Sequence, residues 1–210
     1  MQTRAIKEII ESITTHLQKN KDYLNELDRA VGDGDHGSNI YRGFEAVLAD
    51  SQTWEDLNLS ATMKKIGMVL LGKVGGASGV LYASACLKIS QGLNKESFNN
   101  EDFLNAMKVG IAEIMLKGKS KIGDKTMLDA MSGFTEAFAK KMQETSDFYE
   151  IFKYAVNGAK EGDEKTKDMV AKSGRASYLG ERSIGHIDAG ATSFCVIAEG
   201  ILEYLEKNRG

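Results

Sequence analysis

The stretch Ile6-Lys7-Glu8-Ile9-Ile10-Glu11-Ser12-Ile13-Thr14-Thr15-His16-Leu17 decides the fold class, because its apolar residues recur at steps of three and four. A helix with 3.6 residues per turn places residues at this spacing on one face. The charged and polar residues between them then occupy the opposite face. The stretch therefore predicts an amphipathic helix whose apolar face packs against a core.

The same period recurs along the rest of the chain, and no stretch alternates as a half-buried strand would. Apolar stripes lie at residues 44–48, 63–70, 103–115, 127–138, 148–159 and 194–205, and a further apolar helix is predicted over residues 80–89. Proline is absent, whereas the 22 glycines exceed the average usage of about 7%, which indicates helices joined by glycine turns. We predict an all-α bundle of about eight helices, forming a single domain over residues 1–210.

Charge and cysteine content argue against several classes of protein. With 27 Lys+Arg against 30 Asp+Glu the net charge is −3, so the chain offers no electrostatic basis for binding nucleic acid. The longest apolar run, Met68-Val69-Leu70-Leu71, is far shorter than the roughly 18 residues of a membrane span. The charged start does not resemble a signal peptide, and Cys86 and Cys195 are interpreted as reduced core thiols. We therefore expect a cytoplasmic protein.

Four connections between the predicted helices are dense in glycine and in side chains that can bind ligands. They span residues 31–39, 72–79, 118–126 and 174–191, and they hold thirteen of the 22 glycines. In an up-and-down bundle every second loop lies at the same end, so several of these loops can converge. The sequence therefore predicts one functional site at one end of the bundle.

The first of these connections belongs to an acidic stretch, Leu27-Asp28-Arg29-Ala30-Val31-Gly32-Asp33-Gly34-Asp35-His36-Gly37-Ser38-Asn39. Its carboxylates at Asp28, Asp33 and Asp35 repel one another unless a cation lies among them. Hard oxygen ligands of this kind suit Mg²⁺ or Ca²⁺. The alternative is a solvated acidic turn in which Asp35 or Ser38 caps the next helix.

The identity of the cation can be narrowed from spacing. An EF-hand that began at Asp33 would need a bidentate Glu at its twelfth position, where Phe44 stands. Mg²⁺ usually shares its coordination shell with phosphate, and His36, Ser38 and Asn39 directly downstream are candidate phosphate ligands. For His36 the alternative is that it only braces the turn.

Two further connections are compatible with phosphate binding but are weaker signals. In Gly72-Lys73-Val74-Gly75-Gly76-Ala77-Ser78-Gly79, backbone amides without neighbouring Cβ atoms can approach a phosphate, although glycines also permit close helix packing. Residues 118–126 place small and polar side chains before another helix, and by themselves they favour a capped helix start with solvated lysines.

The fourth connection is the longest non-periodic stretch of the chain. A loop of this length in a compact domain is usually functional or disordered, and residues 174–191 are too aromatic and apolar for simple disorder. Arg175 or Arg182 could supply the guanidinium that phosphates favour. The alternative for either arginine is a structural ion pair to Glu181 or Asp188.

Taken together, these motifs resemble the nucleotide-binding L subunit of dihydroxyacetone kinase. The acidic stretch is followed in the family's order by Gly75-Gly76-Ala77-Ser78-Gly79, Gly123-Asp124-Lys125-Thr126-Met127 and Gly174-Arg175-Ala176-Ser177-Tyr178-Leu179-Gly180-Glu181-Arg182-Ser183. The resemblance covers essentially the whole chain. It implies an eight-helix antiparallel up-and-down barrel with the nucleotide site at one end.

The resemblance also implies a set of site residues. Asp28, Asp33 and Asp35 would hold two Mg²⁺ ions that bridge the phosphates of ADP. The residues implied around the nucleotide are, for the phosphates, His36, Gly37, Ser38, Asn39, Ala77, Ser78 and Arg175; for the adenine, Gly118, Thr126 and Met127; and for closing the pocket, Asp188, Ala189 and Gly190. No nucleophile is expected on this chain, and Arg175 is the candidate for stabilising the transferred phosphoryl group.

The length of 210 residues, which accommodates only the L domain, is similar to the phosphotransferase-system type of the family. The resemblance then implies that ADP stays bound as a coenzyme. A phosphohistidine on an M subunit would rephosphorylate it, and the phosphate would pass to dihydroxyacetone held on a K subunit. The alternatives are the L half of a split ATP-dependent kinase for a triose or related small ketose, and a non-catalytic regulatory module that carries ADP. A homodimer is left open.

Two positions depart from the pattern that the resemblance implies. Val80 and Ala189 stand where relatives commonly have proline. Because each replacement restores backbone freedom, we expect both to loosen the loops that contain them.

Overall fold

The computed structural model describes residues 3–93 and 97–209, and this part of the chain is helical without any strand. Its α-helices are α1 (Thr3–Arg29), α2 (His36–Ser51), α3 (Leu59–Lys73), α4 (Gly76–Ser90), α5 (Asn100–Gly118), α6 (Met127–Lys141), α7 (Phe148–Lys165) and α8 (Ala189–Lys207). Two 3₁₀ helices, η1 (Thr166–Asp168) and η2 (Arg175–Ser183), lie between α7 and α8. The all-α prediction is confirmed. None of these helices combines the length and the apolar character that crossing a membrane requires.

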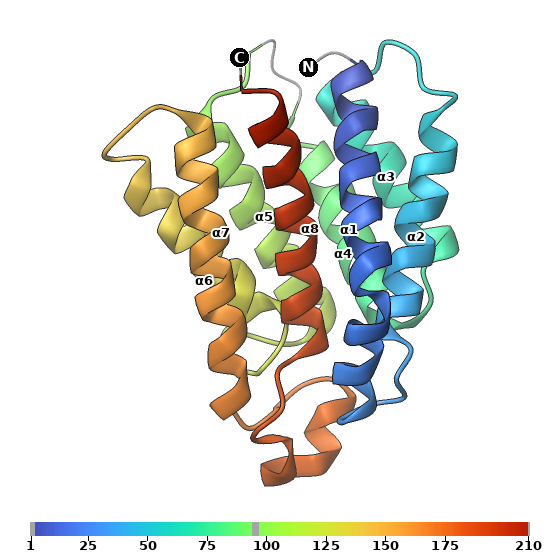
Figure 1. The fold of residues 1–210 in the computed structure, drawn as a ribbon, viewed down its shortest axis with the longest axis vertical. Coiled ribbons are helices and arrows are strands. Elements are labelled where there is room, and N and C mark those ends of the chain that lie inside the picture. The colour runs from blue at the N-terminus through green and yellow to red at the C-terminus, as the bar shows by residue number, and fades with distance from the viewer. Residues whose placement is uncertain (1–2, 94–96, 210) are drawn as a thin grey trace.

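The helices run alternately up and down and close on themselves (Figure 1). Each packs against the next in the sequence, and α8 completes the ring by packing against α1. The connections that follow α1, α3, α5 and α7 therefore lie at one end of the molecule, which is the lower end in Figure 1.

The core is built from the apolar stripes that the sequence shows. In α1 the side chains of Ile6, Ile10 and Leu17 are buried, whereas Ile9 is only partly buried at the margin of the core. Farther along the chain, phenylalanines from α5, α6 and α7 pack edge to face or tilted, with ring centroids 5.1–6.4 Å apart. Burial of these faces orients each helix and thereby sets where its ends lie.

Helices α6 and α7 approach each other through glycines. A Cβ atom built on Gly158 would meet the carbonyl oxygen of Gly133 and the side chain of Ala137 at under 3.0 Å. A Cβ on Gly133 would in turn meet the carbonyl oxygen of Gly158, and one on Gly162 would meet that of Asp129. Because the obstacles are mostly backbone atoms, this crossing has no room for a side chain at these glycines.

The connection predicted at residues 72–79 is much shorter in the structure. Helix α3 continues to Lys73 and α4 begins at Gly76, so only Val74 and Gly75 lie between them. The helix predicted to begin at Val80 thus begins four residues earlier. At this boundary Val74 packs beside Gly79, where any Cβ would collide with it.

The same boundaries correct the expectation for the two positions that lack proline. Val80 lies inside α4, and Ala189 is the first residue of α8. Neither position is part of a loop, so the expected loosening does not apply. At Ala189 a proline would suit the first helical position, because the N–H there has no intrahelical partner.

Both cysteines are free thiols, as the sequence indicates. Burial raises the pKa of Cys86 to about 12, and it also raises the pKa of Cys195. At neutral pH neither side chain is a thiolate, so both are unreactive core groups.

Candidate functional site

A cavity of about 530 Å³ lies at the end where the even-numbered helices begin. All four glycine-rich connections contribute to its lining, although they are far apart in the sequence. The up-and-down arrangement brings them together, so the predicted convergence on one site is confirmed.

Helices α2, α4, α6 and α8 direct their N-termini at this cavity. The first N–H groups of a helix lack intrahelical partners and carry partial positive charge, so such ends attract anions. The N-termini of α6 and α8 are capped by the side chains of Thr126 and Asp188. The N-cap residues of α2 and α4 make no side-chain cap. In α2, however, the N–H groups of His36 and Ser38 already donate to the side chains of Asp28 and Asn25. The start of α4 is therefore the part of the cavity best suited to phosphate.

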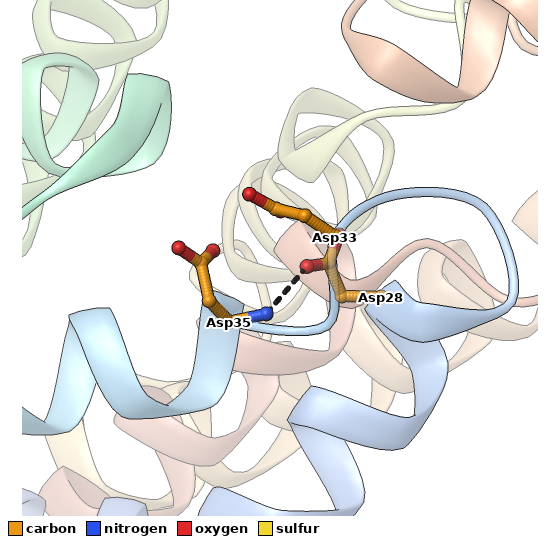
Figure 2. Close-up of side chains that lie close together, drawn as sticks. All are labelled: Asp28, Asp33 and Asp35. Atoms are coloured by element: carbon orange, nitrogen blue, oxygen red, sulfur yellow. Dashed lines mark hydrogen bonds between the residues drawn. The ribbon is translucent and has the colours of Figure 1, made fainter.

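Three carboxylates gather where α1 passes into α2. One ligand atom from each of Asp28, Asp33 and Asp35 can be chosen so that all lie within 4.8 Å of one another, and Figure 2 shows the three carboxyl groups on the same side of the loop. Asp28 is partly buried, whereas Asp33 and Asp35 are exposed. In the described chain this is the group of acidic, His or Cys side chains with the spacing of a metal site.

Asp28 holds this loop in shape. Its Oδ2 accepts backbone N–H groups from Gly34 at 2.8 Å, Asp35 at 3.0 Å and His36 at 3.3 Å, and Figure 2 shows the second of these bonds. Gly34 has a φ of +76°, a conformation that other residues rarely adopt. Asp28 therefore organises the turn, whereas the exposed side chains of Asp33 and Asp35 line the cavity.

Arg175, on η2, reaches across the cavity and forms an ion pair with Asp33. The hydrogen bond from its guanidinium lowers the pKa of Asp33. The sequence left Glu181 and Asp188 open as partners of this arginine, and the structure instead pairs it with the acidic loop. Two predicted site residues that are 142 positions apart are thus brought into contact.

His36 lies at the first turn of α2 with only 8% of its surface exposed. Its Nδ1 is 3.3 Å from the hydroxyl of Ser78 on α4, so the histidine joins the first turns of α2 and α4. Its Nε2 is buried without a hydrogen-bond partner in the structure. Burial lowers the pKa of His36, which favours the neutral imidazole.

Comparison with known proteins agrees with this arrangement. The family model described as the DAK2 domain matches residues 30–203. The chain belongs to the DAK2 domain family.

Relatives of this DAK2 domain include two bacterial subunits. The PEP-dependent dihydroxyacetone kinase 1 ADP-binding subunit DhaL of Listeria innocua is 38% identical over 187 residues, which cover 89% of each chain. The PTS-dependent dihydroxyacetone kinase ADP-binding subunit DhaL of Lactococcus lactis is also 38% identical, over 89% of this chain and 90% of its own.

Among solved structures, the dihydroxyacetone kinase of C. freundii in its native form superposes with a TM-score of 0.72 at 25% identity. The match covers 94% of this chain but 34% of the C. freundii chain.

Most residues that the sequence singled out line the cavity of this DAK2 domain. They are Asp28, Asp33, Asp35, His36, Asn39, Ala77, Ser78, Gly118, Thr126, Met127, Arg175, Asp188, Ala189 and Gly190. Gly37 and Ser38 do not. Gly37 packs against the backbone of α1, and the N–H of Ser38 donates to the side chain of Asn25 at 2.9 Å. Both residues are used to attach α2 to α1.

Lys125 is a cavity residue that sequence reasoning missed. The expected capped start is confirmed, because Thr126 and Asp129 form a capping box at the beginning of α6. The expectation of solvated lysines is wrong for Lys125, whose exposed fraction is 1%. Its amine instead donates to backbone carbonyls of the segment between α7 and α8. Nothing in the local spacing indicates this, because its partners lie more than 40 residues away.

Asp188 introduces a pH dependence into the stability of the DAK2 domain. Its carboxylate caps α8 by accepting the N–H of Ala191 at 2.8 Å, yet burial raises its pKa to about 7. The carboxylates of Asp163 and Asp129 raise this pKa further, and Lys125 lowers it. An unfolded Asp has a pKa of about 4, so the folded state binds the proton more tightly. The contribution of this group to stability is present below pH 4 and is lost as pH rises through 7.

We therefore expect Asp188→Asn to gain stability relative to wild type as pH rises from about 4 to 8, by on the order of 1–2 kcal/mol, since the site is only partly shielded from solvent. An asparagine also caps helices, so the start of α8 is preserved. Urea unfolding at several pH values measures the difference, with exposed Asp168→Asn as the control. A difference that does not change with pH would contradict the assignment.

Proposed function

We propose that this DAK2 domain is the ADP-binding subunit of a dihydroxyacetone kinase. In this proposal it works as a single nucleotide-binding domain. A phosphoryl group passes from a phosphohistidine on an M subunit through the bound nucleotide to dihydroxyacetone on a K subunit. One observation carries the proposal: the uncapped N-terminus of α4, three clustered carboxylates and Arg175 meet in one cavity. The similarity to stand-alone ADP-binding subunits along about nine-tenths of both chains supports it.

The residues present fit a nucleotide with magnesium. Phosphates are anions, and the first turn of α4 offers them N–H groups without a side-chain cap. Carboxylate oxygens are the ligands that Mg²⁺ prefers, so Asp28, Asp33 and Asp35 would hold the metal, for which we propose two ions. Bound there, magnesium would neutralise phosphate charge during transfer.

The roles of the remaining residues follow from their places in the cavity. Gly118 and Met127 border it where α5 ends and α6 begins, and we assign the adenine to this side. Arg175 lines the cavity beside Asp33, where its guanidinium would hold a transferred phosphoryl group. The chain forms no covalent intermediate in this proposal. Its contribution is to position the nucleotide and to neutralise its charge.

Retention of ADP tests the proposal. The protein is purified without added nucleotide, desalted extensively and denatured, and the released adenine nucleotide and magnesium are quantified. We expect about one ADP per chain, because a coenzyme must remain bound between turnovers. Arg175→Ala is expected to shorten retention, whereas Arg182→Ala, an exposed arginine of the same helix that does not line the cavity, serves as the matched control.

Other outcomes would identify the alternatives. An empty protein that binds and rapidly exchanges ATP would indicate the L half of a split ATP-dependent kinase for a triose or related small ketose. Normal ADP and magnesium binding without transfer to any K subunit would indicate a regulatory module. The cytoplasmic location and a homodimer stay predictions that this experiment does not address.

A further inference from the structure

The segment between α7 and α8, residues 166–188, forms a strap across the lower end of the barrel (Figure 1). Its two arms, residues 166–171 and 183–188, are joined by hydrogen bonds. The N–H of Gly185 donates to the carbonyl of Lys167 at 2.8 Å, and the N–H of Ala171 donates to the hydroxyl of Ser183 at 2.9 Å. The residues between the arms project from the barrel and carry Arg175.

Lys125 occupies the space between the two arms. Its amine donates to four backbone carbonyls, those of Thr166 at 2.8 Å, Met169 at 3.2 Å, Ser183 at 2.7 Å and His186 at 2.5 Å. Two of these carbonyls belong to each arm. An ammonium group has three N–H donors, so all of its hydrogens are used for the strap.

Both the backbone conformation of Lys125 and the burial of its amine are energetically unfavourable, so the rest of the fold must hold this residue in place. Its backbone φ of +62° is rare for a residue with a side chain, and its amine is removed from water. Burial lowers the pKa of this amine, so the charged form depends on the surrounding oxygens. A buried lysine whose amine donates only to backbone carbonyls of another segment indicates that the lysine fixes the position of that segment.

The strap and the cavity meet at this lysine. Lys125 directly precedes Thr126 and Met127 on the side assigned to the adenine. The carbonyl of its other neighbour, Asp124, accepts the N–H of Lys172 on the strap at 3.1 Å. Three residues beyond Lys172 is Arg175, which pairs with Asp33. A short path therefore leads from Lys125 through the strap to the acidic loop.

We propose that Lys125 is a positioning residue whose ammonium group clamps the two arms of the strap and so holds Arg175 against the acidic loop. This rests on the proposed function, in which Arg175 binds phosphate and must therefore be held in position. The clamp itself is independent of any ligand. The amine must be protonated, because only the ammonium form has three N–H donors, and with these it can reach carbonyls from both arms.

Hydrogen exchange tests the clamp directly. In Lys125→Met, which keeps an unbranched side chain of similar volume but removes every donor, we expect amides of residues 166–188 to exchange at least on the order of tenfold faster. Trypsin should also cleave faster after Lys172, Arg175 and Arg182. Amides of α1 and of the α6–α7 pair should keep their protection. The matched control is Lys121→Met, an exposed lysine of the same connection.

A double-mutant cycle then tests the link to phosphate. Affinity for ADP with Mg²⁺ is measured in wild type, Lys125→Met, Arg175→Ala and the double variant. If Lys125 acts through Arg175, each single variant should weaken binding by on the order of tenfold, and the double variant should be little worse than either. Affinity for adenosine, which has no phosphate, should change little in Lys125→Met. If this variant loses as much affinity for adenosine as for ADP, Lys125 does not act through the phosphate.

The outcomes separate the clamp from the proposed function. Strap exchange in Lys125→Met equal to that in Lys121→Met, or strictly additive effects in the cycle, would overturn the clamp. Failure of wild type to bind ADP would overturn the function but leave the exchange result in place. If Lys125→Met does not fold, Lys125→Gln, which keeps two N–H donors without the charge, provides the same comparison and should show intermediate exchange.

Discussion

Asp33→Asn is expected to lower the rate of phosphoryl transfer by about 10³-fold when the K and M partners are present, with little change in stability. The carboxylate is one of three that gather at the start of α2, and an amide offers a divalent cation a neutral ligand instead of a charged one. The fold should tolerate the change, because Asp28 and not Asp33 accepts the hydrogen bonds that shape the loop.

Two comparisons isolate the metal-binding role of this carboxylate, since Asp33→Asn also removes the ion pair with Arg175. Binding of Mg²⁺ or Mn²⁺ in the presence of ADP should weaken in Asp33→Asn but change much less in Arg175→Ala. Asp22→Asn, an exposed carboxylate on α1, is the matched control for the loss of one negative charge. Unchanged turnover in Asp33→Asn would remove the acidic loop from the mechanism.

Gly158→Ala is expected to destabilise the protein by about 3 kcal/mol, at the upper end of overpacking costs. The new methyl group would meet the backbone of Gly133 and the side chain of Ala137, so α6 and α7 must separate to admit it. In a chain of this size the loss corresponds to a decrease in Tm of about 10 °C, which thermal unfolding measures.

Gly72→Ala is the matched control for that substitution. Gly72 also lies inside a helix, but a Cβ there meets nothing within 4 Å. Alanine is the better helix former, so this variant should gain about 0.5–1 kcal/mol. Equal effects of the two alanines would show that helix propensity, and not the close α6–α7 approach, governs the response.

Much of the fold could be predicted from residues close together in the sequence. The isoleucine stripe of α1 is buried because a 3.6-residue period and an apolar face together specify a packed helix. Alternation of helices and glycine-rich connections was sufficient to predict that four loops meet at one end. The carboxylates of the acidic loop could be identified because all three lie within eight residues.

Other features depended on contacts that local patterns do not encode. The start of α4 at Gly76 brings Val74 against Gly79, and the use of Ser38 for attachment follows from its contact with Asn25. The sequence left open whether Arg175 pairs with Glu181, Asp188 or phosphate, and its contact with Asp33 depends on how the strap crosses the barrel.

Local sequence determined the helical class of this protein, the order of its helices and the chemistry gathered at its connections, because helix periodicity and loop composition act over a few neighbouring residues. Tertiary structure alone decided which of those side chains face the cavity and which hold the fold together. Lys125 shows the difference most clearly. Its charge is visible in the sequence, but its burial depends on four carbonyls that lie 41 to 61 residues farther along the chain and meet only when α7 and α8 close the barrel.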